Sequence, residues 1–133
     1  MEFRNGAELL ELCAREDCLI SQVMRRRECE QGEAAPDRVE ARMARALEIM
    51  RESATQPLKT PARSMGGLIG GEAKRLAAHA AKKKALCGPV LQRAITYAMA
   101  VLEVNASMGL IVAAPTAGSS GVVPGLLLAL QDE

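Results

Sequence analysis

The sequence has almost no aromatic residues. Tryptophan is absent, and Phe3 and Tyr97 are the only aromatic side chains among 133 residues. Proteins that bind single-stranded nucleic acid need aromatic rings on which bases stack, so this class of function is disfavoured. The net charge of +1 also provides no field that would attract nucleic acid or an anionic membrane. We therefore expect no nucleic-acid partner and no membrane partner.

Paired cysteine motifs are missing as well. The four cysteines are Cys13, Cys18, Cys29 and Cys87, and no two of them form a C-x-x-C motif. This argues against zinc-ribbon and thioredoxin-like sites. The N-terminal residues also lack the basic-then-apolar order of a secretory signal. We expect free thiols in a reducing cytoplasm, and the sequence assigns no role to any of the four.

A core without aromatic residues must be built from Leu, Val, Met and Ala. Alanine and methionine favour helices, and 133 residues fit a single domain. The apolar spacing predicts helices over residues 6–30 and 36–53, a linker over 54–64, and three later helices. Lys82-Lys83-Lys84 is expected at a solvated helix end. The sequence therefore predicts an all-α single domain over residues 1–133, with about five helices and two glycine-rich loops.

The two glycine-rich segments interrupt this helical pattern. Residues 64–72 read SMGGLIGGE, and residues 108–125 read MGLIVAAPTAGSSGVVPG, within a stretch that carries no charge from Val104 to Gln131. Glycine allows a ligand to approach the backbone closely, and free N–H groups at a helix start suit an anion. The first segment lacks the G-K-[ST] of a P-loop and follows no strand, so it is no nucleotide fingerprint. We expect the two loops to converge on one small-anion pocket.

Other interpretations of these segments remain open. The uncharged stretch is long enough for a membrane helix, although its prolines, glycines and hydroxyls disfavour that assignment. It can also be a buried turn without a ligand, since glycine and proline punctuate loops of every kind. Lys74 can add positive charge beside the first loop or be an ordinary exposed helix lysine.

Three segments together resemble the alpha chain of the iron–sulfur-dependent L-serine dehydratase family. They are SMGGLIGGEAK at 64–74, EVNASMG at 103–109 and IVAAPTAGSSGVVPG at 111–125. The resemblance covers about residues 53–130. It implies that L-serine is converted to pyruvate and ammonia, with a 4Fe–4S cluster acting as Lewis acid on the substrate hydroxyl. The positions that match the motifs, and are thereby implied to bind or shape the substrate pocket, are Ser64, Gly70, Gly71, Lys74, Asn105, Thr116, Gly118, Ser119 and Ser120.

The chain also departs from the family pattern. The family's cluster cysteines lie downstream of the VVPG segment, and none of the four cysteines here occupies such a motif. We therefore expect no metal ligand in this chain, and the catalytic base is unknown. The implied partners are L-serine, a beta chain or domain, and the remaining C-terminal half of an alpha chain. A different hypothesis is a non-catalytic helical module that keeps the loops for packing or for binding a partner.

Overall fold

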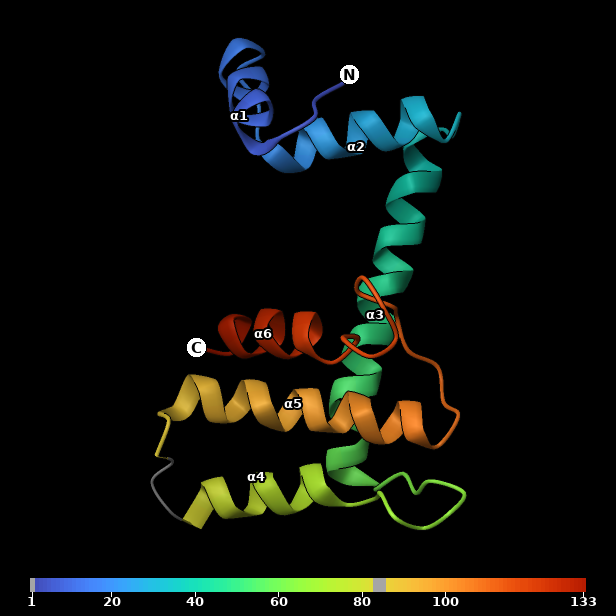
Figure 1. Cartoon of the computed structure of the whole chain (residues 1–133), viewed down its shortest axis with the longest axis vertical. Coiled ribbons are helices and arrows are strands. Elements are labelled where there is room, and N and C mark those ends of the chain that lie inside the picture. Colours follow the sequence, from blue (N-terminus) through green and yellow to red (C-terminus); the bar gives the residue numbers. More distant parts are fainter. Residues whose placement is uncertain (1, 83–85) are drawn as a thin grey trace. The chain divides into compact units, whose positions relative to one another are not determined.

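The chain is all-helical in the computed structural model, which describes residues 2–82 and 86–133 (Figure 1). This confirms the predicted fold class, with six helices in place of about five among the described residues. Of the predicted basic helix end, only Lys82 is described, and Lys83 and Lys84 lie outside the described residues. The helices are α1 (Gly6–Arg15), α2 (Ile20–Gln31), α3 (Pro36–Lys59), α4 (Glu72–Lys82), α5 (Pro89–Ala106) and α6 (Val122–Gln131).

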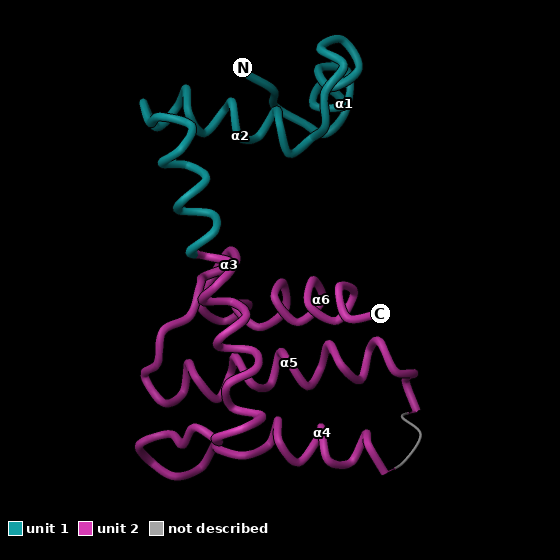
Figure 2. The backbone as a smooth tube through the Cα atoms, turned by 180° about the vertical axis from the view of Figure 1, so that it is seen from behind, with its two compact units in different colours: residues 1–45 teal, residues 46–133 magenta. Residues whose placement is uncertain are grey.

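The helices form two compact units (Figure 2). Unit 1 is Met1–Arg45 and unit 2 is Ala46–Glu133, so the boundary falls inside α3. Both glycine-rich loops belong to unit 2. No helix among the described residues is long and apolar enough to cross a membrane.

The single helix predicted over residues 6–30 is wrong, because α1 and α2 are separate helices. The N-terminus of α1 is as predicted, with the Asn5 side chain accepting a hydrogen bond from the Glu8 N–H at 3.0 Å. The chain then turns at Asp17, whose φ of 47° is left-handed, a conformation that Asp tolerates better than most residues. Helix α2 has a start of its own, where the Leu19 N–H donates to Gln22 Oε1 at 2.8 Å. The apolar spacing runs through both helices and hides this break.

Helix α3 is longer than predicted and contains Pro57. Proline removes one backbone hydrogen bond and crowds the carbonyl four residues earlier, which is why the sequence predicts an end near Ser53. The helix continues because one face of its second half is buried. Ala54 is fully buried and Pro57 is among the largest fully buried side chains. Burial of this face within unit 2 outweighs the lost hydrogen bond.

In unit 2, α4, α5 and α6 lie side by side, with α5 in the middle (Figure 1). Ala54 of α3, Val101 of α5 and Leu128 of α6 form the core cluster, and Tyr97 and Ile111 pack against it. Successive helices run in opposite directions, so the N-termini of α4 and α6 and the C-terminus of α5 lie at one edge (Figure 1). We call this edge, with both glycine-rich loops, the loop edge.

Two glycines allow α6 to pack closely on α5. A Cβ atom built on Gly125 would lie 2.8 Å from the backbone oxygen of Ala94, and one built on Gly121 would lie 2.7 Å from that of Ala98. Both distances are shorter than van der Waals contact. Only glycine therefore fits at either position, and the sequence pattern does not reveal this packing role.

Candidate functional site

All the residues implied to line a substrate pocket belong to unit 2, and they form two groups at the loop edge. The first group precedes or begins α4, and the second precedes α6. Asn105 lies in the last turn of α5, the helix between them. No hydrogen bond among the described residues joins the two loops. Their convergence on one pocket remains a prediction.

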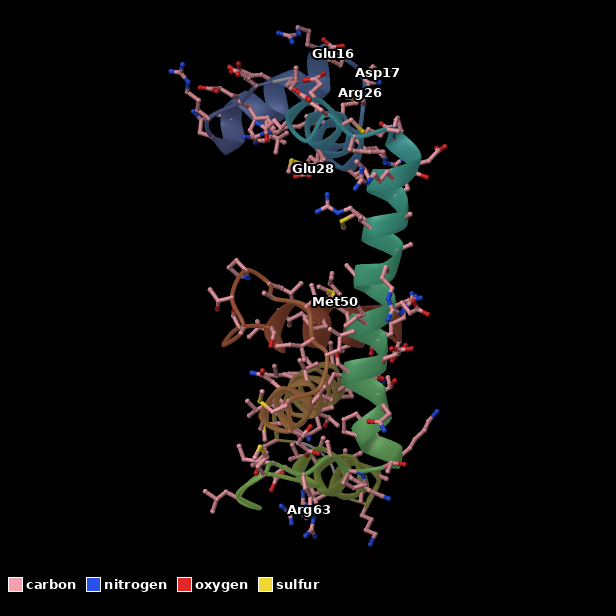
Figure 3. All side chains as sticks on the ribbon, turned by 90° about the vertical axis from the view of Figure 1, so that its right-hand side faces the viewer. Glu16, Asp17, Arg26, Glu28, Met50 and Arg63 are labelled. Carbon is pink, nitrogen blue, oxygen red and sulfur yellow. The ribbon has the colours of Figure 1, made fainter. Side chains whose placement is uncertain are left out.

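The first loop is closed by Ser64. Its N–H donates to the Ile69 carbonyl at 2.9 Å, and its Oγ accepts from the Ile69 N–H at 3.1 Å. The loop begins beside Arg63, which is labelled in Figure 3. Ser64 thus uses its main polar groups to hold the loop together.

Gly70 and Gly71 are required by the backbone. Both have left-handed φ angles, 154° and 90°, where other residues are strained. A Cβ on Gly70 would also lie 2.6 Å from the Ala62 backbone oxygen. The two glycines therefore have a structural reason to be present, independent of any ligand.

The N-terminus of α4 is already occupied by carboxylates of the chain itself. Gly70 N–H donates to Glu72 Oε2 at 2.6 Å, and Ala73 N–H donates to Glu103 Oε1 at 2.7 Å. Acidic groups stabilise a helix N-terminus by complementing its dipole. The Glu103 carboxyl group is fully buried, so an external anion would meet the carboxyl group of Glu72 here.

Glu72 carries its charge readily. Its own backbone N–H and that of Gly70 hold the pKa of this carboxyl below its ordinary value, and Arg75 and Glu103 act in the same direction. Arg75 lies 2.8 Å from Glu72 Oε1. The exposed arginine and the backbone donors thus keep Glu72 ionised beside the glycine loop.

Glu103 is the residue that sequence reasoning underestimated. It is 0% exposed, and its second oxygen, Oε2, is buried without a hydrogen-bond partner. Glutamate is almost never fully buried unless it is paired. The available signal was a single acid within the apolar run of α5. Its contact with Ala73 connects α5 to the start of α4.

Lys74 has a structural contact in this chain. Its Nζ donates to the Lys59 carbonyl at 3.0 Å, which satisfies the C-terminal end of α3. Cations are favourable at that end of a helix. Lys74 therefore links α4 to α3.

The second loop is held by its own hydroxyl groups. Thr116 Oγ1 and Ser119 Oγ lie 3.0 Å apart, and Ser119 Oγ also donates to the Ala114 carbonyl at 3.0 Å. Ser120 is 3% exposed and donates to the Ala117 carbonyl at 2.7 Å. Ser119 and Ser120 therefore shape the loop.

Three predicted residues remain accessible at the loop edge. Thr116 and Gly118 are exposed, and a Cβ on Gly118 would meet nothing closer than Thr116 Oγ1 at 3.8 Å. Asn105 is half-buried, and its side-chain amide makes no hydrogen bond with the described part of the chain. An unused amide offers both a donor and an acceptor to a ligand.

The residues of this chain do not fit a 4Fe–4S cluster. All four cysteines are free thiols. Among residues 2–82 and 86–133, no group of three or more His, Cys, Asp or Glu side chains is placed to hold a metal ion. Cluster ligation requires several thiolates around one site, and no reaction step through a cluster can be assigned to this chain.

Comparison with known proteins identifies the family. The sequence profile of the serine dehydratase alpha chain matches residues 15–133. The chain is 42% identical to the probable L-serine dehydratase alpha chain of Bacillus subtilis over 131 residues, covering 98% of this chain and 43% of that protein. It is 32% identical to the L-serine dehydratase alpha chain of Peptoniphilus asaccharolyticus over 126 residues, which are 95% and 43% of the two chains.

The chain thus spans less than half the length of these relatives. No solved structure matches it significantly. The profile match covers most of the chain and includes both glycine-rich loops and the segment between them. On this evidence the chain belongs to the serine dehydratase alpha chain family.

Proposed function

We propose that this chain forms part of the substrate pocket of an L-serine dehydratase, which converts L-serine to pyruvate and ammonia. The observation that carries the proposal is the unused amide of Asn105, located in the α5 turn between the two glycine-rich loops. Family membership supplies the reaction. The helix directions supply the geometry, because they bring both loops to one edge (Figure 1).

The two loops differ in charge, and this suggests an orientation for the substrate. The accessible acid at the start of α4 is Glu72, whose carboxyl group repels a carboxylate and attracts an ammonium group. The second loop lies in a stretch without charge and exposes Thr116 and Gly118. We place the serine carboxylate at the second loop and at Asn105, with the ammonium group toward Glu72.

The remaining parts of the enzyme come from outside this chain. As the family resemblance implies, the 4Fe–4S cluster is ligated by cysteines of the C-terminal half of an alpha chain, and a beta chain or domain completes the enzyme. When bound, the cluster supplies a Lewis acid for the substrate hydroxyl. The residues of this chain bind and orient the substrate, and the enzyme acts in the cytoplasm.

A non-catalytic module is the second candidate function. It is favoured by the internal contacts of Ser64, Lys74 and Ser120, which need no ligand to explain them. In that case the loops serve to hold the helices α3, α4, α5 and α6 together, and Asn105 faces a protein partner or water.

The test is made in the assembled enzyme that contains this chain, by following pyruvate formation. Gly118→Val adds bulk at an accessible position that has no close neighbour, and we expect turnover to be lost. Asn105→Ala should reduce kcat/KM by roughly 10- to 100-fold, equivalent to about 1–3 kcal/mol. Ser119→Ala should have a milder effect, because its hydroxyl already bonds within the loop.

Gly6→Val is the matched control, since Gly6 is in unit 1 and a Cβ there meets nothing within 4 Å. It should leave turnover unchanged. Normal activity of both Gly118→Val and Asn105→Ala would exclude the pocket and favour the non-catalytic module. Gly70→Val is unsuitable as a probe, because the added side chain collides with the Ala62 backbone.

A further inference from the structure

Cys13 and Cys18 are located on either side of the turn between α1 and α2. Cys13 is in the last turn of α1 and Cys18 lies two residues before α2. Both are half-buried free thiols. The turn between them contains Glu16 and Asp17, which are labelled in Figure 3. Both cysteines and the turn between them belong to unit 1.

A backbone hydrogen bond keeps the two cysteines close together. The Cys18 N–H donates to the Cys13 carbonyl at 3.0 Å. The backbone path from one Cα atom to the other through this contact is about 7.2 Å long, and the fixed bond angle at the Cys13 carbonyl carbon limits the separation of the two Cα atoms to about 6.9 Å. Any further bend in the path brings them closer. Disulfides join Cα atoms that are roughly 4.4–6.8 Å apart. The backbone is therefore already near the geometry that a bridge requires.

Both cysteines also face the same space. They line one surface hollow of about 340 Å³, together with Ala14, Asp17, Leu19 and Gln22. A shared hollow gives a small oxidant access to this turn. The other two cysteines lack this arrangement. Cys29 lies on α2, about 13 Å along the helix axis from Ile20, the first residue of that helix. Cys87 belongs to unit 2.

From this arrangement we propose that Cys13 and Cys18 form a reversible intramolecular disulfide on exposure to a peroxide. One thiolate attacks an oxygen atom of hydrogen peroxide and the O–O bond breaks. The sulfur becomes a sulfenic acid, and the other oxygen leaves as hydroxide, which takes up a proton to give water. The second thiolate attacks that sulfur, the S–S bond forms, and the oxygen leaves as a second water molecule. The two sulfurs together lose two electrons to the peroxide, and their two protons end in the water. A thiol reductant reverses the reaction.

The charge of the hollow selects the oxidant. Asp17 lines it, and its carboxylate repels an anionic oxidant such as oxidised glutathione, whereas hydrogen peroxide is neutral and small. The neighbouring Glu16 is paired with Arg15 at 3.2 Å. The bridge would hold the turn closed and fix Asp17 in its left-handed conformation. It would thereby tie the C-terminus of α1 to the N-terminus of α2.

Trypsin provides a direct assay, because it cleaves after Arg15, between the two cysteines. After peroxide treatment and alkylation of free thiols, residues 5–15 and 16–25 should appear as one cross-linked species. Its mass should be about 2 Da below the sum of the two unmodified peptides. Reduction should release both peptides. Hydrogen exchange in α1 should slow in the oxidised protein and return to its original rate on reduction.

Three variants and one solvent condition make the test decisive. Cys13→Ser and Cys18→Ser should each abolish the cross-linked species, and Cys29→Ser should leave it unchanged. In concentrated urea the link should form at least roughly tenfold more slowly, because the fold no longer positions the thiols. Separate oxidation of Cys13 and Cys18, a bridge to Cys29 or Cys87, or an equal rate in urea would each overturn the proposal.

Discussion

Glu103 is the only charged residue that the described chain buries completely. Its Oε1 satisfies the Ala73 N–H at the start of α4. We expect Glu103→Ala to destabilise the protein by about 2–4 kcal/mol, because it leaves a buried donor unpaired and creates a cavity. Urea unfolding followed by circular dichroism measures this loss.

Glu103→Gln is the matched control for that substitution. Glutamine keeps the shape and the accepting oxygen but has no charge, so it should lose less than about 1 kcal/mol relative to wild type. An equal loss in both variants would show that the carboxylate charge, and not the hydrogen bond to Ala73, stabilises this contact.

Tyr97 predicts a dependence of stability on pH. Burial, followed by the hydrogen bond and charge of Asp132, raises the pKa of Tyr97 to about 12, and its hydroxyl lies 2.5 Å from Asp132 Oδ2. The unfolded value is about 10. The pKa of Tyr97 is higher in the folded chain than in the unfolded chain. The stabilisation that neutral Tyr97 provides is therefore complete below a pH of about 10 and is lost as the pH rises through about 12.

The measurement is simple because Tyr97 is the only tyrosine and tryptophan is absent. Phenolate absorbance of the folded chain should titrate with a midpoint at about 12. In urea, the midpoint for the unfolded chain should be about 10. Asp132→Asn should lower the folded midpoint only in part, since burial is the larger cause. A titration midpoint of about 10 for the folded chain would contradict the burial of Tyr97.

At the scale of elements, the packing of α6 on α5 depends on glycine. In Gly125→Ala the new methyl group would collide with the Ala94 carbonyl, so the helices must separate. We expect a loss of about 1–3 kcal/mol in the free energy of unfolding, as for other overpacked sites. Gly118→Ala, where there is room for a methyl group, should change it by less than about 0.5 kcal/mol. Similar losses in the two variants would argue against close packing at Gly125.

The sequence predicts which segments are helical far better than where helices end. Apolar spacing identifies the helical segments, because it reflects which face is buried. It fails at Asp17, where one left-handed residue breaks a helix without changing the spacing. It fails again at Pro57, because the burial that keeps α3 intact comes from residues distant in the sequence.

Contacts between residues distant in the sequence also limit what can be predicted of the candidate site. Motifs identify the two loops and Asn105, but several residues within them have mainly structural contacts, such as Ser64 and Lys74. Glu103 acts across α5 and α4, and its partner, the Ala73 N–H, belongs to the backbone. A backbone partner leaves no trace in the identity of side chains, so no sequence pattern could have revealed it.

At the scale of the whole molecule, the two units differ in the size of their cores. In the described chain, unit 1 buries only three apolar side chains almost completely, Leu12, Val23 and Val39, whereas unit 2 buries nine, with Pro57 and Pro124 among them. Local stability follows buried apolar contacts. We therefore expect backbone amides of α1 and α2 to exchange with solvent through openings of lower free energy than those of α5.

Two equivalent substitutions test this difference. Val23 and Val101 are 0% and 1% exposed, and replacement of either by Ala removes about 2 kcal/mol of burial. Val23→Ala should accelerate hydrogen exchange in α1 and α2 and leave α5 unchanged. Val101→Ala should accelerate exchange in α5. Accelerated exchange throughout the chain in both variants would show that the units unfold together.

The contact of Gly121 and Gly125 with α5 also has a genetic consequence. The atoms nearest to an added Cβ there are the backbone oxygens of Ala98 and Ala94, and every amino acid has the same backbone oxygen. A substitution on α5 can remove a side chain but not a carbonyl group. A suppressor screen can start from a defective Gly125→Val allele. We expect it to recover alleles in which codon 125 again encodes glycine. Suppressors at codons 94 and 98 should be absent.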